Sequence, residues 1–285
     1  MEINCSTRYM AIIGCPLEHS LSPIMYNGLF RSRQLNYVYL PFATQPEQLE
    51  QVLNSFRALN FIGFNVTIPF KQKVIPFLDE LSDEARACQA VNLVKKEGLL
   101  LKGYNTDGAG LLRGLKENGI DPQGRVMFVG AGGAARSIAF AMARAGMLKA
   151  DFLDIDYGQA EAMAHFIATQ SSVPASAALM TQENFARLAA QTDILINCSP
   201  VGMSPRVDEA PVESLDRLNH DAVVCDIIYN PRRTKLLQMA QSRGLKTIDG
   251  LPMFINQALL TLEILLKQSF EAQEMEEVIS RYVQA

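Results

Sequence analysis

Short apolar runs alternate with longer amphipathic segments along most of the chain. Residues 9–14 form an apolar run that ends at a glycine, as in a buried strand. Residues 45–59 instead place Leu49, Leu53 and Phe56 at helical spacing on one face. Strands that alternate with helices are typical of α/β layers around mostly parallel sheets. The pattern therefore predicts the α/β fold class.

The first part of the chain is predicted to contain strands, helices and a hairpin. The predicted strands are residues 9–14, 36–42 and 63–68. The predicted helices are residues 22–33, 45–59, 71–78 and 82–89. Residues 90–95 and 99–104 are expected to pair as a hairpin that turns near Glu97 and Gly98.

The character of the sequence changes at residues 105–108 (NTDG). Beyond them, predicted strands are residues 125–129, 150–155, 194–197 and 222–227, with helices at 110–118 and 134–145 and between the later strands. Two C-terminal helices, residues 252–267 and 271–283, carry a larger apolar face than the preceding group of strands and helices needs. We therefore predict two domains, residues 1–106 completed by 250–285 and residues 107–249.

Composition and charge exclude several classes of protein. Hydrophobic residues make up 48% and charged residues 20% of the 285 residues, so the chain can bury a sizeable core. The net charge of −4, with no long basic run, argues against a nucleic-acid partner. No apolar stretch reaches the roughly 20 residues that span a bilayer, and the N-terminus lacks the plan of a signal peptide. We therefore expect a cytoplasmic protein.

The sulfur and imidazole side chains show no ligand spacing. The five cysteines are scattered without a CxxC pair, and the three histidines lie far apart. Zinc sites and disulfide frameworks need closely spaced partners. We expect reduced, mostly buried thiols and no metal site.

Residues 126–135 (VMFVGAGGAA) have the pattern of a strand, a glycine turn and the start of a helix. Gly130 permits the tight turn, and Gly132 lets the backbone approach a pyrophosphate, which the helix N–H groups then hold. A purely structural turn is the alternative. Because the sequence predicts both a strand before the glycines and a helix after them, we interpret the segment as a dinucleotide-binding loop.

Two carboxylates follow the next predicted strand. Asp154, or Asp156 as second candidate, lies about 20 residues past the loop, where a carboxylate binds the ribose hydroxyl and repels a 2′-phosphate. This favours NAD over NADP. The alternative role is capping of the following helix. Arg136 could still meet a phosphate, so NADP is kept as a possible cofactor.

Ser20 and Ser22 lie two residues apart in residues 19–23 (HSLSP). Hydroxyls at this spacing can face the same way on an extended segment and suit a polyol or a carboxylate. The alternative is an ordinary serine cap before Pro23. His19, which adjoins both serines, is the second candidate for a catalytic base.

Further polar motifs follow other predicted strands. Asn65 and Thr67 share one strand face, Lys71 comes just after, and Asn92 and Asp107 stand in two short motifs downstream. Each could serve in a turn or a cap. Lysine becomes a competent acid or base once burial lowers its pKa, and a neighbouring carboxylate such as Asp107 could orient it. Lys71 is therefore the first candidate for the catalytic acid or base.

Taken together, these motifs resemble the shikimate/quinate dehydrogenase family, over nearly the whole length. The motifs that carry the resemblance are residues 14–23 (GCPLEHSLSP), 65–71 (NVTIPFK), 90–92 (AVN), 105–108 (NTDG), 130–136 (GAGGAAR), 197–203 (NCSPVGM), 226–231 (DIIYNP) and 249–257 (DGLPMFINQ). The resemblance implies an α/β substrate-binding domain and a doubly wound Rossmann domain for NAD(P).

The resemblance also implies a role for each matching residue. Lys71 and Asp107 form the catalytic pair, and Ser20 and Ser22 hold the substrate carboxylate. Ring hydroxyls are bound by Asn65, Thr67, Asn92, Asp107 and Gln257, and Tyr229 also lines the substrate site. The cofactor is lined by Gly130, Ala131, Gly132, Gly133, Ala134, Ser199, Ile227 and Gly250.

The implied activity is reversible hydride transfer between NAD(P) and a ring hydroxyl of shikimate, with quinate as a further expected substrate. Members that use NADP carry Asn-Arg-Thr where this chain reads Asp154-Ile155-Asp156, which again favours NAD. The expected partner is this small molecule alone, and the chain is expected to be a monomer or a homodimer.

Two further departures from the family leave the substrate more open than the reaction. Many members carry His where this chain has Tyr26, and an aromatic stretch where residues 262–265 read LEIL.

Two alternative functions account for less of the sequence. An enzyme of the methylenetetrahydrofolate dehydrogenase kind would need a pterin pocket and would have no obvious use for the paired serines. A non-catalytic protein of the same fold that senses quinate or shikimate would not need the intact pair of Lys71 and Asp107.

Overall fold

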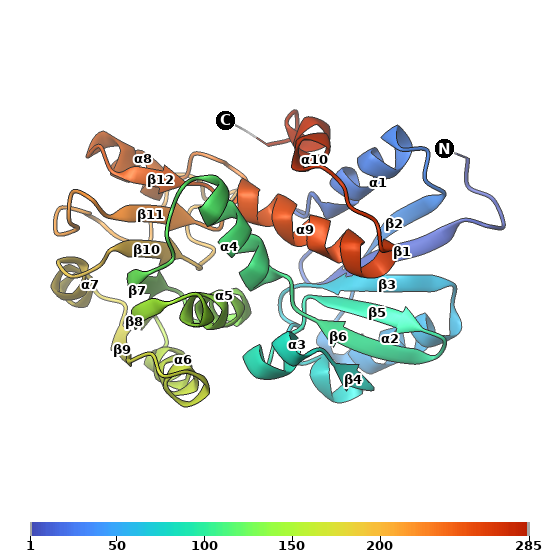
Figure 1. Cartoon of the computed structure of the whole chain (residues 1–285), viewed down its shortest axis with the longest axis horizontal. Helices are drawn as coiled ribbons and strands as arrows, with labels where there is room; N and C mark the ends of the chain where they lie inside the picture. Colours follow the sequence, from blue (N-terminus) through green and yellow to red (C-terminus); the bar gives the residue numbers. More distant parts are fainter. Residues whose placement is uncertain (1, 284–285) are drawn as a thin grey trace. The chain divides into compact units, whose positions relative to one another are not determined.

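Two six-stranded sheets organise the computed structural model, which describes residues 2–283 (Figure 1). The chain folds as two units. The first comprises residues up to 106 together with 258–282, and the second comprises residues 107–257. The division falls within one long helix, α9 (Leu251–Leu266).

The sheet of the first unit has the strand order β2-β1-β3-β5-β6-β4. Its strands are β1 (Arg8–Gly14), β2 (Tyr37–Ala43), β3 (Phe61–Val66), β4 (Glu80–Leu81), β5 (Leu93–Glu97) and β6 (Leu100–Tyr104). β1, β2 and β3 run parallel, whereas β5 is antiparallel to both β3 and β6. The C-terminal ends of β1, β3 and β6 and the N-terminal end of β5 therefore meet at one edge.

Helices cover this sheet and close its core. They are α1 (Ser22–Ser32), η1 (Pro46–Gln48), α2 (Leu49–Ala58), η2 (Ile75–Phe77), α3 (Asp83–Cys88), the last part of α9 and α10 (Ala272–Ile279). α2 buries Leu49, Leu53 and Phe56, the face that its periodicity predicts, in a cluster with Phe64 of β3.

The sheet of the second unit is entirely parallel, with the order β12-β11-β10-β7-β8-β9. Its strands are β7 (Gly124–Val129), β8 (Met147–Asp154), β9 (Ala175–Leu179), β10 (Ile194–Asn197), β11 (Val223–Asp226) and β12 (Lys246–Ile248). Counted from β7, this is the doubly wound order 3-2-1-4-5-6. All strands keep the same direction, but the order in which they are added reverses between β7 and β10, which is where ligands bind in such sheets.

Helices flank the parallel sheet in the usual alternation. They are α4 (Asp107–Glu117), α5 (Gly133–Arg144), α6 (Tyr157–Gln170), α7 (Gln182–Ala189), α8 (Lys235–Ser242) and the first part of α9. The core beneath α7 and α8 is built from buried aliphatic side chains such as Leu195, Val224 and Leu237, with Phe185.

The predicted α/β fold class is confirmed, and several element predictions need correction. Residues 71–78 are not a helix: they form turns followed by η2, because Pro76 cannot donate a helical hydrogen bond. β9 and β12 lie outside the predicted strands, since one is built from alanine and serine and the other is only three residues long. α4 begins at Asp107, earlier than the predicted residue 110.

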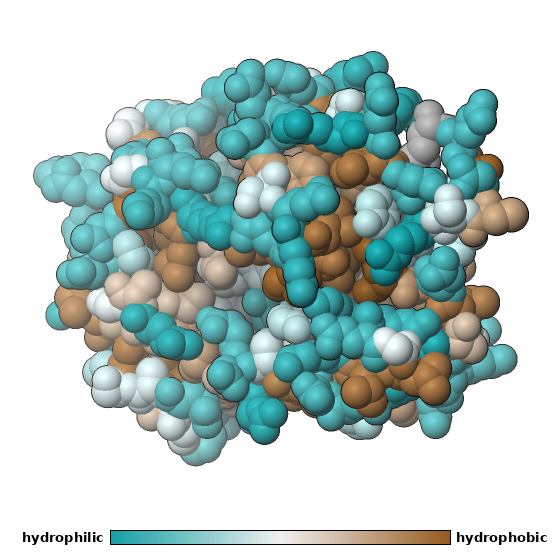
Figure 2. Space-filling view, turned by 45° about the vertical axis from the view of Figure 1, so that its right-hand side comes forward, coloured by the Kyte–Doolittle hydropathy of each residue, from teal (hydrophilic) through white to brown (hydrophobic). Residues whose placement is uncertain are grey.

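On the face seen in Figure 2, hydrophilic residues predominate and hydrophobic residues form smaller groups among them. Within residues 2–283, each helix is too short or too polar to cross a membrane.

Candidate functional site

The polar residues predicted in the first unit gather where its strands end. Thr67 lies just past β3, and its backbone N–H donates to Ile13 of β1 at 3.0 Å. Cys15 donates in return to the carbonyl of Ile68 at 2.9 Å. These bonds join the segment that leads to Ser20 with the segment that leads to Lys71.

The two serines stand at the start of α1. Ser22 is its first residue and is buried, Ser20 is half-buried, and the N–H of Ser22 lies 3.4 Å from Oγ of Ser20. The N-cap residue is Leu21, which makes no side-chain cap bond, so the simple serine cap is not observed. A helix N-terminus without a side-chain cap has N–H groups that suit a carboxylate.

Asn65 is buried and held from both ends of its amide. Its Oδ1 accepts from the hydroxyl of Tyr39 at 2.9 Å. Its Nδ2 donates to the carbonyl of Asn92 at 3.1 Å and lies 3.4 Å from Oγ1 of Thr261 on α9. These partners fix which end of the amide is the donor.

Asn92 makes a reciprocal pair with Thr106. Its Nδ2 donates to Oγ1 of Thr106 at 2.9 Å, and its Oδ1 accepts from the N–H of Thr106 at 2.8 Å. Both residues are almost fully buried. The pair fixes the backbone immediately before Asp107.

Lys71 occupies a constrained turn. Its carbonyl accepts from the N–H of Val91 at 2.7 Å, and the neighbouring Phe70 and Val74 are fully buried. The Lys71 side chain itself is half-buried. The exposed His19, the second candidate for a base, lies on the loop before α1.

Three predicted substrate residues lie together in the second unit. Asp107 is the first residue of α4 and is buried, and a helix N-terminus stabilises a carboxylate. One turn later, a Cβ at Gly110 would lie 2.8 Å from the backbone nitrogen of Gln257. Gln257 donates through Nε2 to the carbonyl of Phe254 at 2.9 Å, and Phe254 stacks on Tyr229 with ring centroids 4.1 Å apart.

The glycine loop has the features that a pyrophosphate requires. Gly130 has a φ of +92°, and a Cβ there would meet the N–H nitrogen of Ser199 at 2.9 Å. Gly132 is exposed, with nothing within 4 Å of a Cβ position, and is the N-cap of α5 without a side-chain cap. Gly133 and Ala134 open the helix. The loop therefore fits a dinucleotide.

The two carboxylates after β8 have different surroundings. Oδ2 of Asp154 accepts from the N–H of Ala131 at 2.7 Å, so this side chain supports the glycine loop. Asp156 is the N-cap of α6 and accepts from Gly158 at 2.9 Å, which is the capping alternative. The guanidinium of Arg136 lies 3.6 Å from the ring centroid of Phe166, a cation–π contact.

The loops after β10, β11 and β12 interlock at the same edge of the sheet. The hydroxyl of Ser199 donates to Oδ1 of Asn197 at 2.7 Å, and the N–H of Ile227 donates to the Asn197 carbonyl at 3.1 Å. Gly250 packs so closely against the backbone of Ile227 that a Cβ at position 250 would lie 2.2 Å from the Ile227 carbonyl oxygen. All three predicted cofactor residues thus lie on interlocking loops at the carboxyl edge of the sheet, and Ser199 lies beside the switch point.

Sequence reasoning missed three side chains that hold these groups: Tyr39, Thr106 and Asp226. Tyr39 and Asp226 lie in predicted strands, where a polar group among apolar neighbours could have drawn attention. Asp226 and Thr106 also stand in two of the family motifs, without an assigned role, and the partner of Thr106, Asn92, is revealed only by the pairing of β5 with β6.

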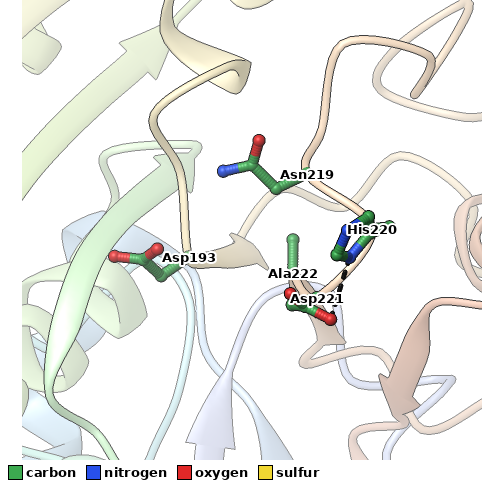
Figure 3. A pocket seen from close by; sticks show the side chains of 5 residues that line it. All are labelled: Asp193, Asn219, His220, Asp221 and Ala222. Atoms are coloured by element: carbon green, nitrogen blue, oxygen red, sulfur yellow. Dashed lines mark ion pairs between the residues drawn. The ribbon is translucent and has the colours of Figure 1, made fainter.

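A shallow pocket of about 350 Å³ lies away from these residues (Figure 3). Its lining residues are Asp193, Asn219, His220, Asp221 and Ala222. They precede β10 and β11, whereas the glycine loop follows β7 in the same parallel sheet. The pocket therefore lies at the opposite edge from the predicted cofactor residues.

Comparison with known proteins gives consistent matches. Residues 12–94 match the family described as the shikimate dehydrogenase substrate binding domain. A shikimate dehydrogenase (NADP⁺) of Syntrophomonas wolfei subsp. wolfei is 48% identical over 284 residues, covering 100% of this chain and 98% of the relative.

Two solved structures are similar over almost the whole chain. The shikimate 5-dehydrogenase of Listeria monocytogenes in complex with shikimate and NAD has a TM-score of 0.90 and 33% identity, covering 98% of each chain. The quinate dehydrogenase of Corynebacterium glutamicum in complex with NAD has a TM-score of 0.87 and 29% identity, covering 96% of this chain and 99% of the other.

Proposed function

Because the chain belongs to the shikimate dehydrogenase family, we propose that it catalyses reversible hydride transfer between NAD(P) and the ring hydroxyl that is oxidised when shikimate becomes 3-dehydroshikimate. The observation that carries the proposal is the grouping of Ser20, Ser22 and Asn65 with Lys71 at one edge of the first sheet. We accordingly assign most of the substrate-binding residues to the first unit and the dinucleotide to the second.

Substrate binding follows from the chemistry of these side chains. The hydroxyls of Ser20 and Ser22, with the N-terminus of α1, bind the carboxylate. The ring hydroxyls are bound by Asn65, Thr67, Asn92, Asp107 and Gln257, and Tyr229 lines the site. A site that pairs several hydroxyls orients the ring and rejects analogues that lack them.

Lys71 and Asp107 carry the proton transfer. NAD(P), when bound, supplies or accepts the hydride. As the alcohol is oxidised, Nζ of Lys71 accepts the hydroxyl proton, and in reduction it returns that proton to the oxygen. The carboxylate of Asp107 orients the ammonium group.

The dinucleotide is held by the glycine loop and the neighbouring loops. The N-terminus of α5 would hold the pyrophosphate, together with Gly130, Ala131, Gly132, Gly133 and Ala134. Ser199, Ile227 and Gly250 line the remainder. The exposed Gly132 supports this assignment, because it has no side chain to keep a phosphate away.

NAD is the favoured cofactor and NADP the second. Asp154 would accept from a ribose hydroxyl and repel a 2′-phosphate. Asp156 is already used as a helix cap, and Arg136 is stacked on Phe166. The relative with 48% identity is named as NADP⁺-dependent, so the preference is a point to measure.

Steady-state kinetics on four combinations, shikimate or quinate with NAD or NADP, test the function. The absorbance of the reduced nicotinamide is the readout. We expect turnover of shikimate, with quinate as the second candidate because of the similarity to a quinate dehydrogenase. Calorimetric binding of shikimate without turnover in any combination would instead indicate a non-catalytic sensor.

Lys71→Ala tests the proton-transfer role. We expect kcat to fall about 10²- to 10⁴-fold, as for loss of a general acid or base, with a modest change in substrate KM. Lys73→Ala removes an exposed lysine two residues away and is the matched control. Turnover near the wild-type rate in Lys71→Ala would remove Lys71 from the mechanism.

Asp154→Asn tests the cofactor preference. The amide oxygen can still accept from Ala131, so the glycine loop keeps this bond, while the charge and the bond from the N–H of Asp156 to Oδ1 are lost. We expect the ratio of kcat/KM for NAD over NADP to fall by about tenfold, equivalent to about 1.4 kcal/mol. Asp156→Asn, which retains a capping side chain, should leave the ratio unchanged. An unaltered ratio in Asp154→Asn would place the discriminating group elsewhere.

A further inference from the structure

Asp226, at the C-terminal end of β11, is fully buried and accepts hydrogen bonds from three separate segments. Its Oδ2 accepts from the hydroxyl of Thr234 at 2.7 Å. Its Oδ1 accepts from Nδ2 of Asn197 and from the N–H of Ile228, both at 3.1 Å. One carboxylate thus joins the end of β10, the loop after β11 and the start of α8.

Asn197 extends this network to the loop after β10. Its Oδ1 accepts from both the N–H and the hydroxyl of Ser199, at 3.1 and 2.7 Å. The hydroxyl of Ser199 in turn accepts from the N–H of Val201 at 3.3 Å. Asp226 and Asn197 are opposite each other in the strand register. The carboxylate therefore orients the amide of Asn197, which in turn orients Ser199.

Ile228 connects the carboxylate to a third loop. Its N–H donates to Asp226, and its carbonyl accepts from the N–H of Gly250 at 3.0 Å. The carboxylate therefore underlies Ser199, Ile227 and Gly250, which we assign to the cofactor.

We propose that Asp226 is a positioning residue for the dinucleotide: its carboxyl group holds the loops after β10, β11 and β12 in the arrangement that NAD(P) binds. This proposal rests on the proposed function, because it uses the assignment of those loops to the cofactor.

Burying a carboxyl group at this position costs free energy. Packing alone therefore does not explain why the residue is an aspartate. Among the described residues Asp226 has no ion-pair partner, and burial raises its pKa to about 7 despite the three hydrogen bonds. The titratable groups that face it are Asp249, itself paired with Arg232, and the thiols of Cys198 and Cys225. An apolar residue would avoid this desolvation but would leave three donors without an acceptor.

Both protonation states of the carboxyl can keep the three contacts. The charged form accepts all three bonds, and the neutral form can donate from Oδ2 to the Thr234 hydroxyl, which is free to rotate. An asparagine has the geometry of the neutral form. Asp226→Asn is therefore the conservative variant, and Asp226→Ala removes the network.

Isothermal titration calorimetry of the full-length protein with NAD⁺, NADP⁺ and shikimate tests the proposal. In Asp226→Ala we expect the Kd of NAD⁺ and NADP⁺ to rise at least about tenfold, with the Kd of shikimate within about threefold of wild type. In Asp226→Asn, the Kd of the dinucleotides and the Kd of shikimate should both stay within about threefold of wild type. A purely structural defect would not separate the cofactor from shikimate.

Asp151→Ala is the matched control. Asp151 is a buried carboxylate in β8 of the same sheet, held by Ser176 and Lys149, and it supports none of the cofactor loops. We expect its cofactor Kd to match wild type. Wild-type cofactor affinity in Asp226→Ala, or equal losses in Asp226→Ala and Asp151→Ala, would overturn the proposal.

A milder variant covers the case in which Asp226→Ala does not fold. Thr234→Val removes the hydroxyl on Oδ2 and should raise the cofactor Kd about three- to tenfold. Because Thr234 also caps α8, Thr181→Val, which removes the cap of α7, is its control. Equal affinities in these two variants would contradict the proposal.

These measurements separate the proposal from the proposed function. If the wild-type protein binds NAD⁺ or NADP⁺ without turning over shikimate, the proposed activity fails while the role of Asp226 in binding is still tested. If it binds neither dinucleotide, both fail.

Discussion

Asn65 shows how a buried amide is oriented by partners remote in sequence. Tyr39, 26 residues before it, and Thr261, 196 residues after it, contact opposite ends of the side chain. The ring of Tyr39 in turn stacks on Tyr26 with centroids 4.4 Å apart. A pre-oriented amide presents its hydrogen-bonding groups to a ring hydroxyl without reorganisation.

Tyr26, which stands where the resemblance implies histidine in many members of the family, belongs to this arrangement. Tyr26 is fully buried, and its hydroxyl lies 3.5 Å from the carbonyl of Ala258 on α9. Burial raises the pKa of the Tyr26 phenol well above its usual value, so it stays neutral. We interpret Tyr26 as a packing group behind Tyr39.

Tyr39→Phe is the corresponding prediction. The variant keeps the stacked ring but leaves Oδ1 of Asn65 without the Tyr39 hydroxyl, a change of about 1–2 kcal/mol. We expect the KM for shikimate to rise about 5- to 30-fold, with the KM for the cofactor unchanged, in steady-state kinetics.

Tyr37→Phe is its control on the same strand, since Tyr37 packs on Phe30 through its ring. If Tyr39→Phe and Tyr37→Phe both keep the wild-type KM for shikimate, Asn65 does not need Tyr39 for its orientation.

At the scale of elements, close packing of two helices completes the first unit. Gly28 of α1 faces α10, and a Cβ at this position would lie 2.2 Å from Cγ1 of Val278. An ion pair between Arg33 and Glu274 at 2.6 Å joins the same two helices, but it is exposed and contributes little. The glycine therefore determines how closely α10 approaches.

Gly28→Ala should destabilise the protein although alanine is the better helix former. Both γ carbons of Val278 lie within 3.0 Å of the new methyl group, and a β-branched side chain cannot turn aside. Overpacking of this kind costs about 1–3 kcal/mol, or a fall in Tm of about 2–6 °C by calorimetry.

Val278→Ala in the same chain should restore most of that loss, because it removes the obstructing methyl groups. A Tm for Gly28→Ala at or above the wild-type value would show that α10 is not held at this distance.

At the scale of the whole molecule, the free energy of unfolding should depend on pH through carboxyl groups whose pKa values shift in opposite directions on folding. Asp226 has a pKa raised from 3.8 to about 7, so the folded state keeps a proton that the unfolded state has lost between these values. The contribution of Asp226 to the free energy of unfolding is fully present below about pH 4 and is lost as the pH rises to 7. Arg33 and Arg57 lower the pKa values of Glu274 and Asp79, whose contributions are instead lost in acid.

Asp226→Asn should remove the loss of stability that Asp226 causes as the pH rises. We expect the Tm of the variant, relative to wild type, to increase by about 2–5 °C between pH 5 and pH 8. Thermal unfolding at both pH values measures this difference. Parallel Tm profiles of the two proteins would show that Asp226 does not titrate in this range.

Much of the architecture was readable from local pattern. The apolar runs at β1, β3, β7 and β10 and the one-sided face of α2 are properties of neighbouring residues, so their periodicity predicts them. The pattern after Phe70 wrongly predicts a helix, because Pro76 cannot donate a helical hydrogen bond and the segment forms turns and η2 instead. The division of labour between the two units, the monomeric or dimeric state and the cytoplasmic location stay predictions.

The sequence by itself determined the order of strands and helices, the glycine loop and the chemical nature of the candidate side chains, because each depends on residues close together in the chain. Only the tertiary structure decided which of them meet. The neighbours of Asn65, Asn92 and Asp226 are set by strand order and register, and a hydrogen bond between segments depends on angstrom-scale placement that no local pattern encodes.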